Sequence, residues 1–394
     1  MLSSASRVLR LITWVLLRAL STRAHAVVHG WPDDEANAIE VVRGLLRRYP
    51  GRIYVLQNDP AFWSPRLPQE EGGRLVRLPK NSLAALRVSL RAEVTFFTHG
   101  LSTAVDPPGD RLVVNLWHGD GPKSTRQPRL VRSTVVVSGA ALWAAYKAEL
   151  FAVPPQNVLL TGNPRIDQFD EPLVETVLRR FGLNPGRRCV LWMPTYREAR
   201  GPRDRAWSDG IRLSGSSEVA VLATALAAHA EALPIDLVIK PHPLDADSYS
   251  GLGCHVVTGE QLNRAGVTLY QLLGHCDALI SDVSSAWVDY LVLDRPIGFY
   301  MPDLDEFISR RGLNVSDLPT LVPGPLLQDA DQARAFLDEV AGAAPRRRPS
   351  SYPGFAKIGP VRHTGATDRL LDALSEFQLR RGRAPLFTSA EPPV

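Results

Sequence analysis

The stretch "DALISDVSSAWVDYLVLDRPIGFY", residues 277–300, decides the fold. Its apolar run "DALISD" predicts a buried strand, a short loop with two serines follows, and residues 284–294 have the length and spacing of a helix. A second apolar run, "RPIGFY", then predicts another strand. A strand, a helix and a strand in close succession are typical of a parallel sheet that carries helices on both faces.

The same alternation extends over both halves of the 394-residue chain. The strands predicted in the first half are "AVVHG", "RIYVLQ", "RLVRL", "EVTFFT", "RLVVNLWH" and "TVVVSG", and a helix is predicted over 34–48. In the second half, "RCVLWMP", "IDLVIKPHP" and "CHVVT" precede the two strands already quoted, with helices over 216–232 and 269–275. The segment 162–172 and the Arg-rich segment 344–354 are rich in turn residues, so we expect a linker and a solvated loop there.

A chain of this length exceeds the size at which one hydrophobic core usually stops growing, so we expect two domains. We predict a Rossmann-like acceptor-side domain over 25–168 and a Rossmann-like nucleotide-donor domain over 169–394. Whether the last helix packs back on the first domain stays open. Doubly wound sheets bind ligands at the carboxyl ends of their strands, and that is where we expect the site.

The composition, with 45% apolar and 22% charged residues, is that of an ordinary globular protein. The net charge of +4 and the arginines near the N-terminus and at 345–349 favour phosphorylated ligands or an anionic membrane surface over nucleic acid. Cys189, Cys254 and Cys276 have no metal or redox spacing, which favours the reducing cytosol. Because no acidic pair or Cys/His set suggests a metal site, we expect metal-independent chemistry.

The N-terminal segment "SRVLRLITWVLLRALSTRAHAVVHG" allows three interpretations. Its arginines interrupt the apolar run, which is too short to span a membrane. A signal peptide ending near "AHA" (24–26) and a helix packed on the protein are two alternatives. We favour the third, a basic amphipathic helix over 1–24 at a membrane interface. Drawn as a helix, the segment separates its arginines from its apolar residues: Arg7, Arg10 and Arg18 lie opposite Leu9, Ile12, Leu16 and Leu20.

Polar side chains follow several predicted strands at their carboxyl ends. "LWHGDGPK" (116–123) leaves its strand with a His and a Lys, although a tight turn needs only Gly or Pro. "VLWMPTYRE" and "LVIKPHP" end in the same way. Since the carboxyl ends of parallel strands meet at one edge of a sheet, we expect these side chains to line a ligand cleft. They are His118, Lys123, Thr195, Arg197, Lys240 and His242.

The double serine of "SDVSS" allows a structural and a functional interpretation. Ser285 is placed to cap the following helix, and capping alone would account for it. Alternatively, Ser284, Ser285 and the N–H groups of the helix N-terminus bind a phosphate. Asp289 follows one turn later, where its carboxylate would repel a phosphate, so we expect it to accept from a ligand hydroxyl.

Six stretches, in order and at suitable spacing, resemble the CDP-glycerol glycerophosphotransferase family, the teichoic-acid primases and polymerases. The resemblance runs from about Asn115 to Pro325 over "WHGDGPK", "GNPRID", "MPTYR", "KPHP", "DALISDVSSAWVDYLVLDRPIGFY" and "PDLDEF…RG…PGP". It implies a GT-B fold of two facing Rossmann-like domains and peripheral attachment to the cytoplasmic face of the cell membrane. It also implies transfer of glycerol phosphate from CDP-glycerol to a lipid-linked or polymer acceptor.

Carried over by position, the resemblance implies that the matched motifs bind the donor. The sequence departs from the family pattern at Asp120–Pro122 and at Val283, which leaves the donor alcohol and the acceptor open. The implied donor-binding residues are Gly119, Asp120, Lys123, Arg165, Pro194, Thr195, Arg197, Lys240, Pro241, Ser284, Ser285 and Asp289.

Phosphoryl transfer from a CDP-alcohol needs a base for the attacking hydroxyl and fixed cations around the diphosphate. We expect His118 to be the base, with His242 as the alternative, and no cofactor besides the donor. Two rival functions remain: a GT-B glycosyltransferase that uses a nucleotide sugar, and a membrane-bound scaffold without turnover.

Overall fold

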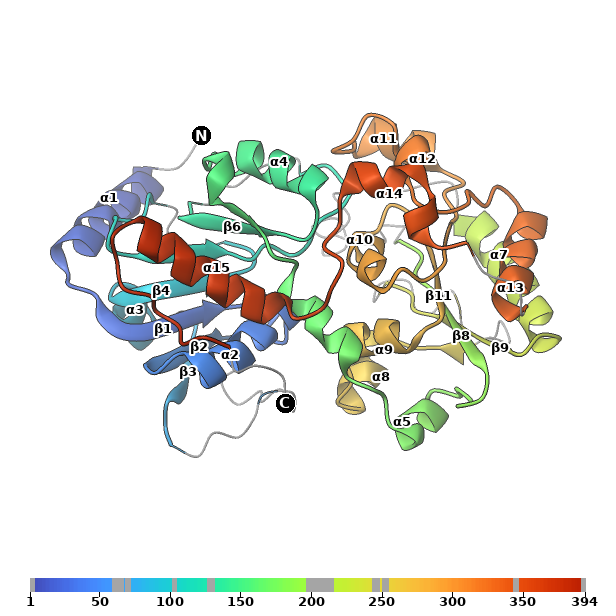
Figure 1. Cartoon of the computed structure of the whole chain (residues 1–394), viewed down its shortest axis with the longest axis horizontal. Coiled ribbons are helices and arrows are strands. Elements are labelled where there is room, and N and C mark those ends of the chain that lie inside the picture. Colours follow the sequence, from blue (N-terminus) through green and yellow to red (C-terminus); the bar gives the residue numbers. More distant parts are fainter. Residues whose placement is uncertain are drawn as a thin grey trace. The chain divides into compact units, whose positions relative to one another are not determined.

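The computed structural model describes residues 4–58, 67, 72–100, 105–125, 132–195, 216–242, 249, 255–342 and 347–390. The chain divides into two compact units (Figure 1). Unit 1 comprises Met1–Asp120, Gln127–Asp167 and His363–Val394, and unit 2 comprises Gly121–Arg126 and Gln168–Arg362. The sequence-based division assigned 169–394 to one domain, whereas the structure returns residues 363–394 to unit 1.

Unit 1 is built on a parallel sheet of seven strands in the order β3-β2-β1-β4-β5-β6-β7. Six of the strands coincide with predicted strands. The seventh, β7, has three residues and was not predicted. The strands are β1 (Arg23–His29), β2 (Arg52–Gln57), β3 (Leu75–Pro79), β4 (Ala92–Phe97), β5 (Leu112–Asn115), β6 (Val135–Ser138) and β7 (Val158–Leu160).

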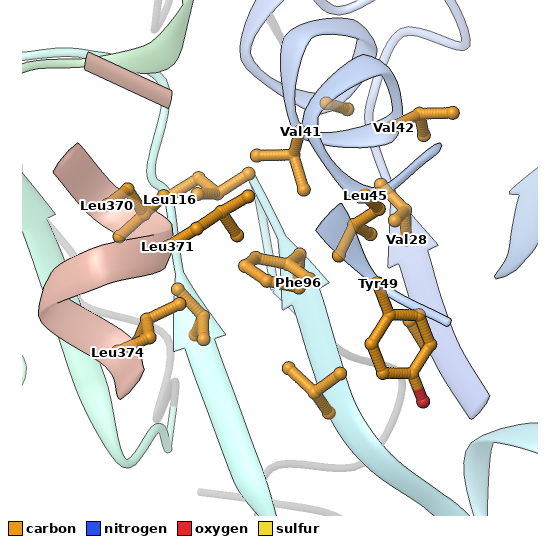
Figure 2. Packing of buried hydrophobic residues seen from close by; sticks show 14 of the residues in the cluster. Val28, Val41, Val42, Leu45, Tyr49, Phe96, Leu116, Leu370, Leu371 and Leu374 are labelled. Carbon is orange, nitrogen blue, oxygen red and sulfur yellow. The ribbon is translucent and has the colours of Figure 1, made fainter. Parts of the chain in front are cut away.

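Helices cover both faces of this sheet, as the alternating pattern predicts. On one face, α2 (Ala36–Arg48) and α15 (Ala366–Arg380) lie side by side over β1, β4 and β5. On the other, α3 (Leu83–Ser89) packs beneath β1 and β2, and α4 (Ala141–Leu150) lies against β6 and β7. Figure 2 shows the first of these layers, formed by Val28, Val41, Val42, Leu45, Tyr49, Phe96, Leu116, Leu370, Leu371 and Leu374.

The C-terminal helix α15 is fixed to unit 1 by capping and by close packing. The Asp167 carboxylate accepts from the backbone N–H groups of Ala366 (2.6 Å) and Thr367 (2.9 Å) at the start of the helix. A Cβ on Gly44 of α2 would lie 2.5 Å from a Thr367 methyl group, so only glycine lets the two helices approach this closely. Asp167 lies in η2 (Pro164–Asp170), a 3₁₀-helix where a plain linker was expected.

Unit 2 repeats the scheme with a parallel sheet of five strands in the order β10-β9-β8-β11-β12. Helices α7 (Ser216–Glu231) and α13 (Ala330–Ala341) cover one face. On the other, Trp287 of α10 (Ala286–Tyr290) packs edge-to-face on Phe299, with ring centroids 5.3 Å apart. The strands are β8 (Arg188–Trp192), β9 (Ile235–Ile239), β10 (His255–Val256), β11 (Ala278–Ser281) and β12 (Ile297–Phe299).

The remaining helices of unit 2 are short. They are α5 (Glu175–Arg180), α8 (Gly259–Arg264), α9 (Leu269–His275), α11 (Leu304–Arg310), α12 (Leu318–Leu321) and α14 (Pro353–Ile358). The segment 344–354, expected as a loop, contains a 3₁₀-turn over Pro349–Ser351 and the first residues of α14.

The N-terminal segment forms helix α1 (Ser4–Ala19), whose outward face is apolar. Thr13 is buried on the inward side, and the Arg111 guanidinium holds the C-terminal end by donating to the carbonyls of Leu17 (2.9 Å) and Leu20 (2.7 Å). Leu16 and Leu20, expected on the apolar face with Leu9 and Ile12, are half-buried instead. Exposed large apolar side chains gather on α1: Val8, Leu9, Leu11, Ile12, Trp14 and Val15.

Among the described residues, no helix is both long and apolar enough to cross a bilayer. The helix lacks acidic residues, and Arg18 stacks its guanidinium on Trp14, 4.0 Å from the ring centroid. The side chain of Arg7 lies outside the described part of the helix.

Candidate functional site

The predicted site residues follow strands at the carboxyl edges of the two sheets, and the structure separates them into two groups. The division falls inside the stretch "LWHGDGPK". His118, Gly119 and Asp120 belong to unit 1, whereas Gly121 to Arg126 belong to unit 2. The histidine and the lysine of this stretch therefore have different surroundings.

In unit 1, the His118 ring is fixed by aromatic neighbours. It stacks on the His99 ring with centroids 4.7 Å apart and planes at 19°, and the Trp117 ring lies 4.1 Å from it. The backbone turns sharply here, with φ +54° at Trp117 and +121° at Gly119. A Cβ on Gly119 would lie 2.2 Å from a guanidinium nitrogen of Arg165, so the position requires glycine.

The surroundings of His118 favour its neutral form. Burial, and to a smaller extent His99, Arg165 and Lys147, together lower its pKa to about 3, because a further positive charge is unfavourable there. The side chain of His118 is nevertheless solvent-exposed, and solvent weakens both effects. Both act in the same direction, so His118 is an unprotonated imidazole at neutral pH, the form that can accept a proton.

Asp120 was expected to contact a donor, and the structure does not support that role. Its carboxylate is buried inside unit 1, where it pairs with the Lys147 ammonium at 2.8 Å. It also accepts from the Ser138 hydroxyl (2.9 Å), the Gly139 N–H (2.7 Å) and the Asn163 amide (3.0 Å). With its oxygens satisfied inside the protein, Asp120 fixes the loop that carries His118.

Arg165 also supports this loop. It is buried, and its guanidinium donates to the His118 carbonyl at 3.1 Å, while its backbone N–H donates to Asn37 at 3.1 Å. Its positive charge favours the ionised form of Glu35, whose carboxylate caps α2 by accepting from the Ala38 N–H at 2.9 Å. The structure therefore places Arg165 beside His118 in unit 1.

In unit 2, hydrogen bonds from Asn314 to backbone carbonyls hold the segment that carries Lys123. The Asn314 amide donates to the carbonyls of Gly121 (3.1 Å) and Lys123 (2.7 Å), and the Asn314 N–H donates to the Pro122 carbonyl at 2.7 Å. Gly121 packs so closely on Ser285 that a Cβ would lie 2.8 Å from the serine Cβ. The Lys123 ammonium reaches the Thr195 hydroxyl at 3.5 Å.

The loops after β8 and β11 are joined by Asp282, a residue that the sequence interpretation did not select. Its carboxylate accepts from the Thr195 N–H (2.7 Å), the Thr195 hydroxyl (2.5 Å) and the Ser284 N–H (3.1 Å). Ser285 makes no side-chain cap for α10, so capping does not account for that residue. The Ser284 hydroxyl instead accepts from the Ala286 N–H at 3.4 Å.

Lys240 and His242 follow β9 beside these loops, and the Lys240 ammonium adds positive charge there. Burial lowers the pKa of Lys240, and within the described residues its ammonium has neither a hydrogen bond nor an ion pair. Burial first, and then the charges of Lys240 and Lys123, together lower the pKa of His242 to about 4. These electrostatic effects place Lys123, Lys240 and His242 in one cationic cluster of unit 2.

The remaining predicted site residues lie in the protein interior, in loops or outside the described residues. Asp289 is buried and accepts from the Tyr270 hydroxyl at 2.7 Å, so a tyrosine of the protein supplies the hydroxyl that was expected from a ligand. Pro194 and Pro241 are buried in the loops after β8 and β9. Arg197 lies outside the described residues. Within those residues, no group of three or more His, Cys, Asp or Glu could hold a metal ion, and metal independence stays a prediction.

Two doubly wound parallel sheets with polar residues after their strands define a class of α/β proteins that has solved members. The wall teichoic acid polymerase TagF superposes with a TM-score of 0.67 at 15% identity, over 96% of this chain and 98% of that one. A putative UDP-N-acetylglucosamine 2-epimerase from Listeria monocytogenes reaches 0.54 at 11% identity, over 92% and 98%. At such identities the likeness shows the fold alone.

The family follows from the sequence. The model of CDP-Glycerol:Poly(glycerophosphate) glycerophosphotransferase matches residues 52–375, so this chain belongs to that family, and the resemblance stated above is confirmed. A teichoic acid ribitol-phosphate primase of Bacillus spizizenii is 26% identical over 243 residues, 58% of this chain and 56% of the primase. A teichoic acid glycerol-phosphate transferase of Staphylococcus aureus is 24% identical over 221 residues, 53% and 52% of the two chains. This chain thus spans about half the length of each relative.

Proposed function

We propose that the protein transfers an alditol phosphate, glycerol phosphate or a close relative, from a CDP-alcohol to a hydroxyl of a lipid-linked or polymer acceptor. Family membership supports this reaction, and the relatives named above act in teichoic acid synthesis. A structure of TagF soaked with CDPG, with a TM-score of 0.67 to this chain, supports a CDP-alcohol as the donor.

The observation that carries the proposal is the cationic cluster of unit 2. A half-buried ammonium without a partner is costly, and a bound anion removes that cost. Within the part of the chain that the structure describes, Lys240 is such a group, and Lys123 and His242 share its surroundings. The hydroxyl of Thr195 and the 282–285 turn, ordered by Asp282, supply polar groups beside it. A diphosphate, with its two negative charges, matches this cluster.

The proposed reaction replaces one O–P bond by another. The acceptor oxygen attacks the phosphorus that carries the alditol, a new O–P bond forms, and the bond to the CMP oxygen breaks. CMP leaves with that electron pair as a phosphate, so it needs no acid. The proton of the acceptor hydroxyl goes to neutral His118, with His242 as the alternative base.

Replacing Lys240 by methionine tests the donor site. We expect the dissociation constant for CDP-glycerol or CDP-ribitol, measured by calorimetry on the full chain, to rise about 10–100-fold, because hydrogen bonds to charged groups contribute about 1.5–3 kcal/mol. Lys357→Met, at an exposed lysine of α14, is the matched control and should bind normally. Unchanged donor affinity in Lys240→Met would contradict the site.

We also propose that α1 holds the enzyme on the cytoplasmic face of the cell membrane. Six exposed apolar side chains on one helix, flanked by arginines and without an acidic residue, fit an anionic lipid surface. CDP-alcohols and lipid-linked acceptors meet at that face, which the family resemblance also implies.

A further inference from the structure

The carboxyl edge of unit 1 carries more histidines than the proposed reaction uses. A His-Gly pair ends three neighbouring strands: His29 closes β1, His99 follows β4 and His118 follows β5. Because β1, β4 and β5 are adjacent in the sheet, their loops leave the same edge together. Only His118 was selected from the sequence, so the other two need an explanation.

We propose that His99 is a positioning residue for His118: its ring, locked by Thr98, holds the His118 imidazole by stacking in the orientation needed to accept a proton. This inference rests on the proposed role of His118 as the base. It adds a residue, and a chain of contacts behind it, that neither the family match nor the motifs assign.

The hydrogen bonds that hold the His99 ring begin at Thr98, which is fully buried. Its hydroxyl oxygen accepts from the Trp31 N–H at 3.1 Å and lies 3.0 Å from Nδ1 of His99. A buried hydroxyl needs an acceptor for its own proton, and among the described residues His99 Nδ1 is the one in reach. The Thr98 O–H therefore donates to Nδ1, which leaves the His99 proton on Nε2.

This hydrogen bond requires the His99 ring to be neutral. A protonated ring would turn Nδ1 into a donor and leave the buried Thr98 proton without an acceptor. Burial first, and then the neighbouring His29, Lys80 and Arg165, together lower the pKa of His99 to about 4. The Trp31 ring, edge-on at 5.0 Å and 71°, packs on His99 from the loop after β1.

The neutral ring then acts on His118 in two ways. The stacked geometry, 4.7 Å between centroids and 19° between planes, restrains the ring of an otherwise exposed side chain. It also excludes water from one face, which disfavours the imidazolium. The charged groups that face His118 are Arg165 of η2 and Lys147 of α4, and both act in the same direction as His99.

The direct test is a titration of the His118 imidazole by NMR in the full chain with labelled histidine, the signal being assigned by its absence in His118→Asn. In His99→Ala we expect the His118 pKa to move up towards 6.5, because water reaches the ring and a cation-disfavouring neighbour is lost. His99→Phe, which keeps a stacked ring, should retain most of the wild-type ring-current shift. His229→Phe, at a surface histidine of α7, is the control and should leave the signal unchanged.

Kinetics supply the second readout, as CMP release from CDP-glycerol or CDP-ribitol. For His99→Ala we expect kcat to fall about 10–100-fold with little change in donor KM, since a misplaced catalytic group costs up to about 100-fold. The acid limb of the profile of kcat against pH should move to higher pH, because a base with a raised pKa becomes protonated at a higher pH. His99→Phe should recover most of kcat.

The two proposals fail in distinguishable ways. If His99→Ala is folded but keeps the wild-type His118 titration and ring-current shift, the positioning role is overturned, whatever the kinetics show. If those signals change as expected while kcat of His118→Ala remains that of wild type, His99 does position His118, but His118 is not the base.

Discussion

At the scale of single residues, the loop after β5 shows how a buried charge pair supports an exposed reactive group. Asp120 and Lys147 are both buried, and their pairing at 2.8 Å is completed by hydrogen bonds to Ser138, Gly139 and Val137. His118 lies two residues away and remains exposed. The loop is therefore rigid on its inner side and accessible on its outer side.

Replacing Asp120 by asparagine should destabilise unit 1 by about 3–5 kcal/mol, because Lys147 would keep a buried charge without a counterion. The measurement is urea unfolding followed by hydrogen exchange at unit 1 amides. Asp106→Asn, which removes an exposed pair with Arg132, is the control and should cost less than about 1 kcal/mol. A double variant with Lys147→Met should regain part of the loss. Equal stability of Asp120→Asn and the control would contradict this account.

The residues that the sequence interpretation missed are those whose partners lie on other strands. Asp282 joins the loops after β8 and β11, and nothing in "SDVSS" reveals that Thr195 is its partner. Cys189 and Cys276 have no telling spacing, yet their sulfurs lie 2.9 Å apart, one on β8 and the other at the C-terminal end of α9. His99 had a signal in the sequence, the His-Gly pair that recurs at or shortly after the ends of β1, β4 and β5.

At the scale of elements, most of the strands and the helices α2, α7 and α9 follow from hydrophobic periodicity. The buried runs of β1, β8, β9 and β11 alternate with helices close to the predicted ranges. Two elements were not predicted: β7, and η2, whose Asp167 caps a helix that begins 199 residues further along the chain. The face that α1 turns outward was also not predictable, since Arg111 and the buried Thr13 set it.

Helix α1 should bind vesicles that contain phosphatidylglycerol. Replacing both Leu11 and Val15 by glutamate should weaken binding of the full chain by at least about 100-fold, since each buried apolar side chain contributes about 1.5–3 kcal/mol. The measurement is co-sedimentation with the vesicles. Leu379→Glu, at an exposed leucine of α15, is the matched control. If the double variant sediments as wild type does, α1 is not the membrane contact.

At the scale of the whole molecule, each of the two doubly wound sheets carries its own group of polar residues after its strands. Unit 2 contains the cationic cluster that we assign to the donor, and unit 1 contains the neutral imidazole that we assign to the acceptor hydroxyl. The fold class and the family could be predicted from the sequence because each strand and each motif is a short stretch that can be recognised without its partners in the fold. The identity of the donor alcohol could not, because no short motif encodes it.

The whole reaction is checked by CMP release from a panel of donors. We expect turnover with CDP-glycerol or CDP-ribitol, none with UDP-sugars, and no loss in excess EDTA, because fixed cations of the protein neutralise the diphosphate. Transfer from a UDP-sugar would favour a glycosyltransferase instead. Loss of turnover in EDTA, restored by a divalent cation, would refute metal independence, and absence of release from every donor would favour a scaffold.

The central claim is that neutral His118 takes the proton of the attacking hydroxyl. The most direct measurement compares His118→Ala with wild type in kcat and in the dissociation constant for the CDP-alcohol. The account predicts a loss of about 10²–10⁴-fold in kcat, the usual contribution of a general base, with donor affinity nearly unchanged. A variant that keeps kcat at saturation while donor binding collapses would contradict it.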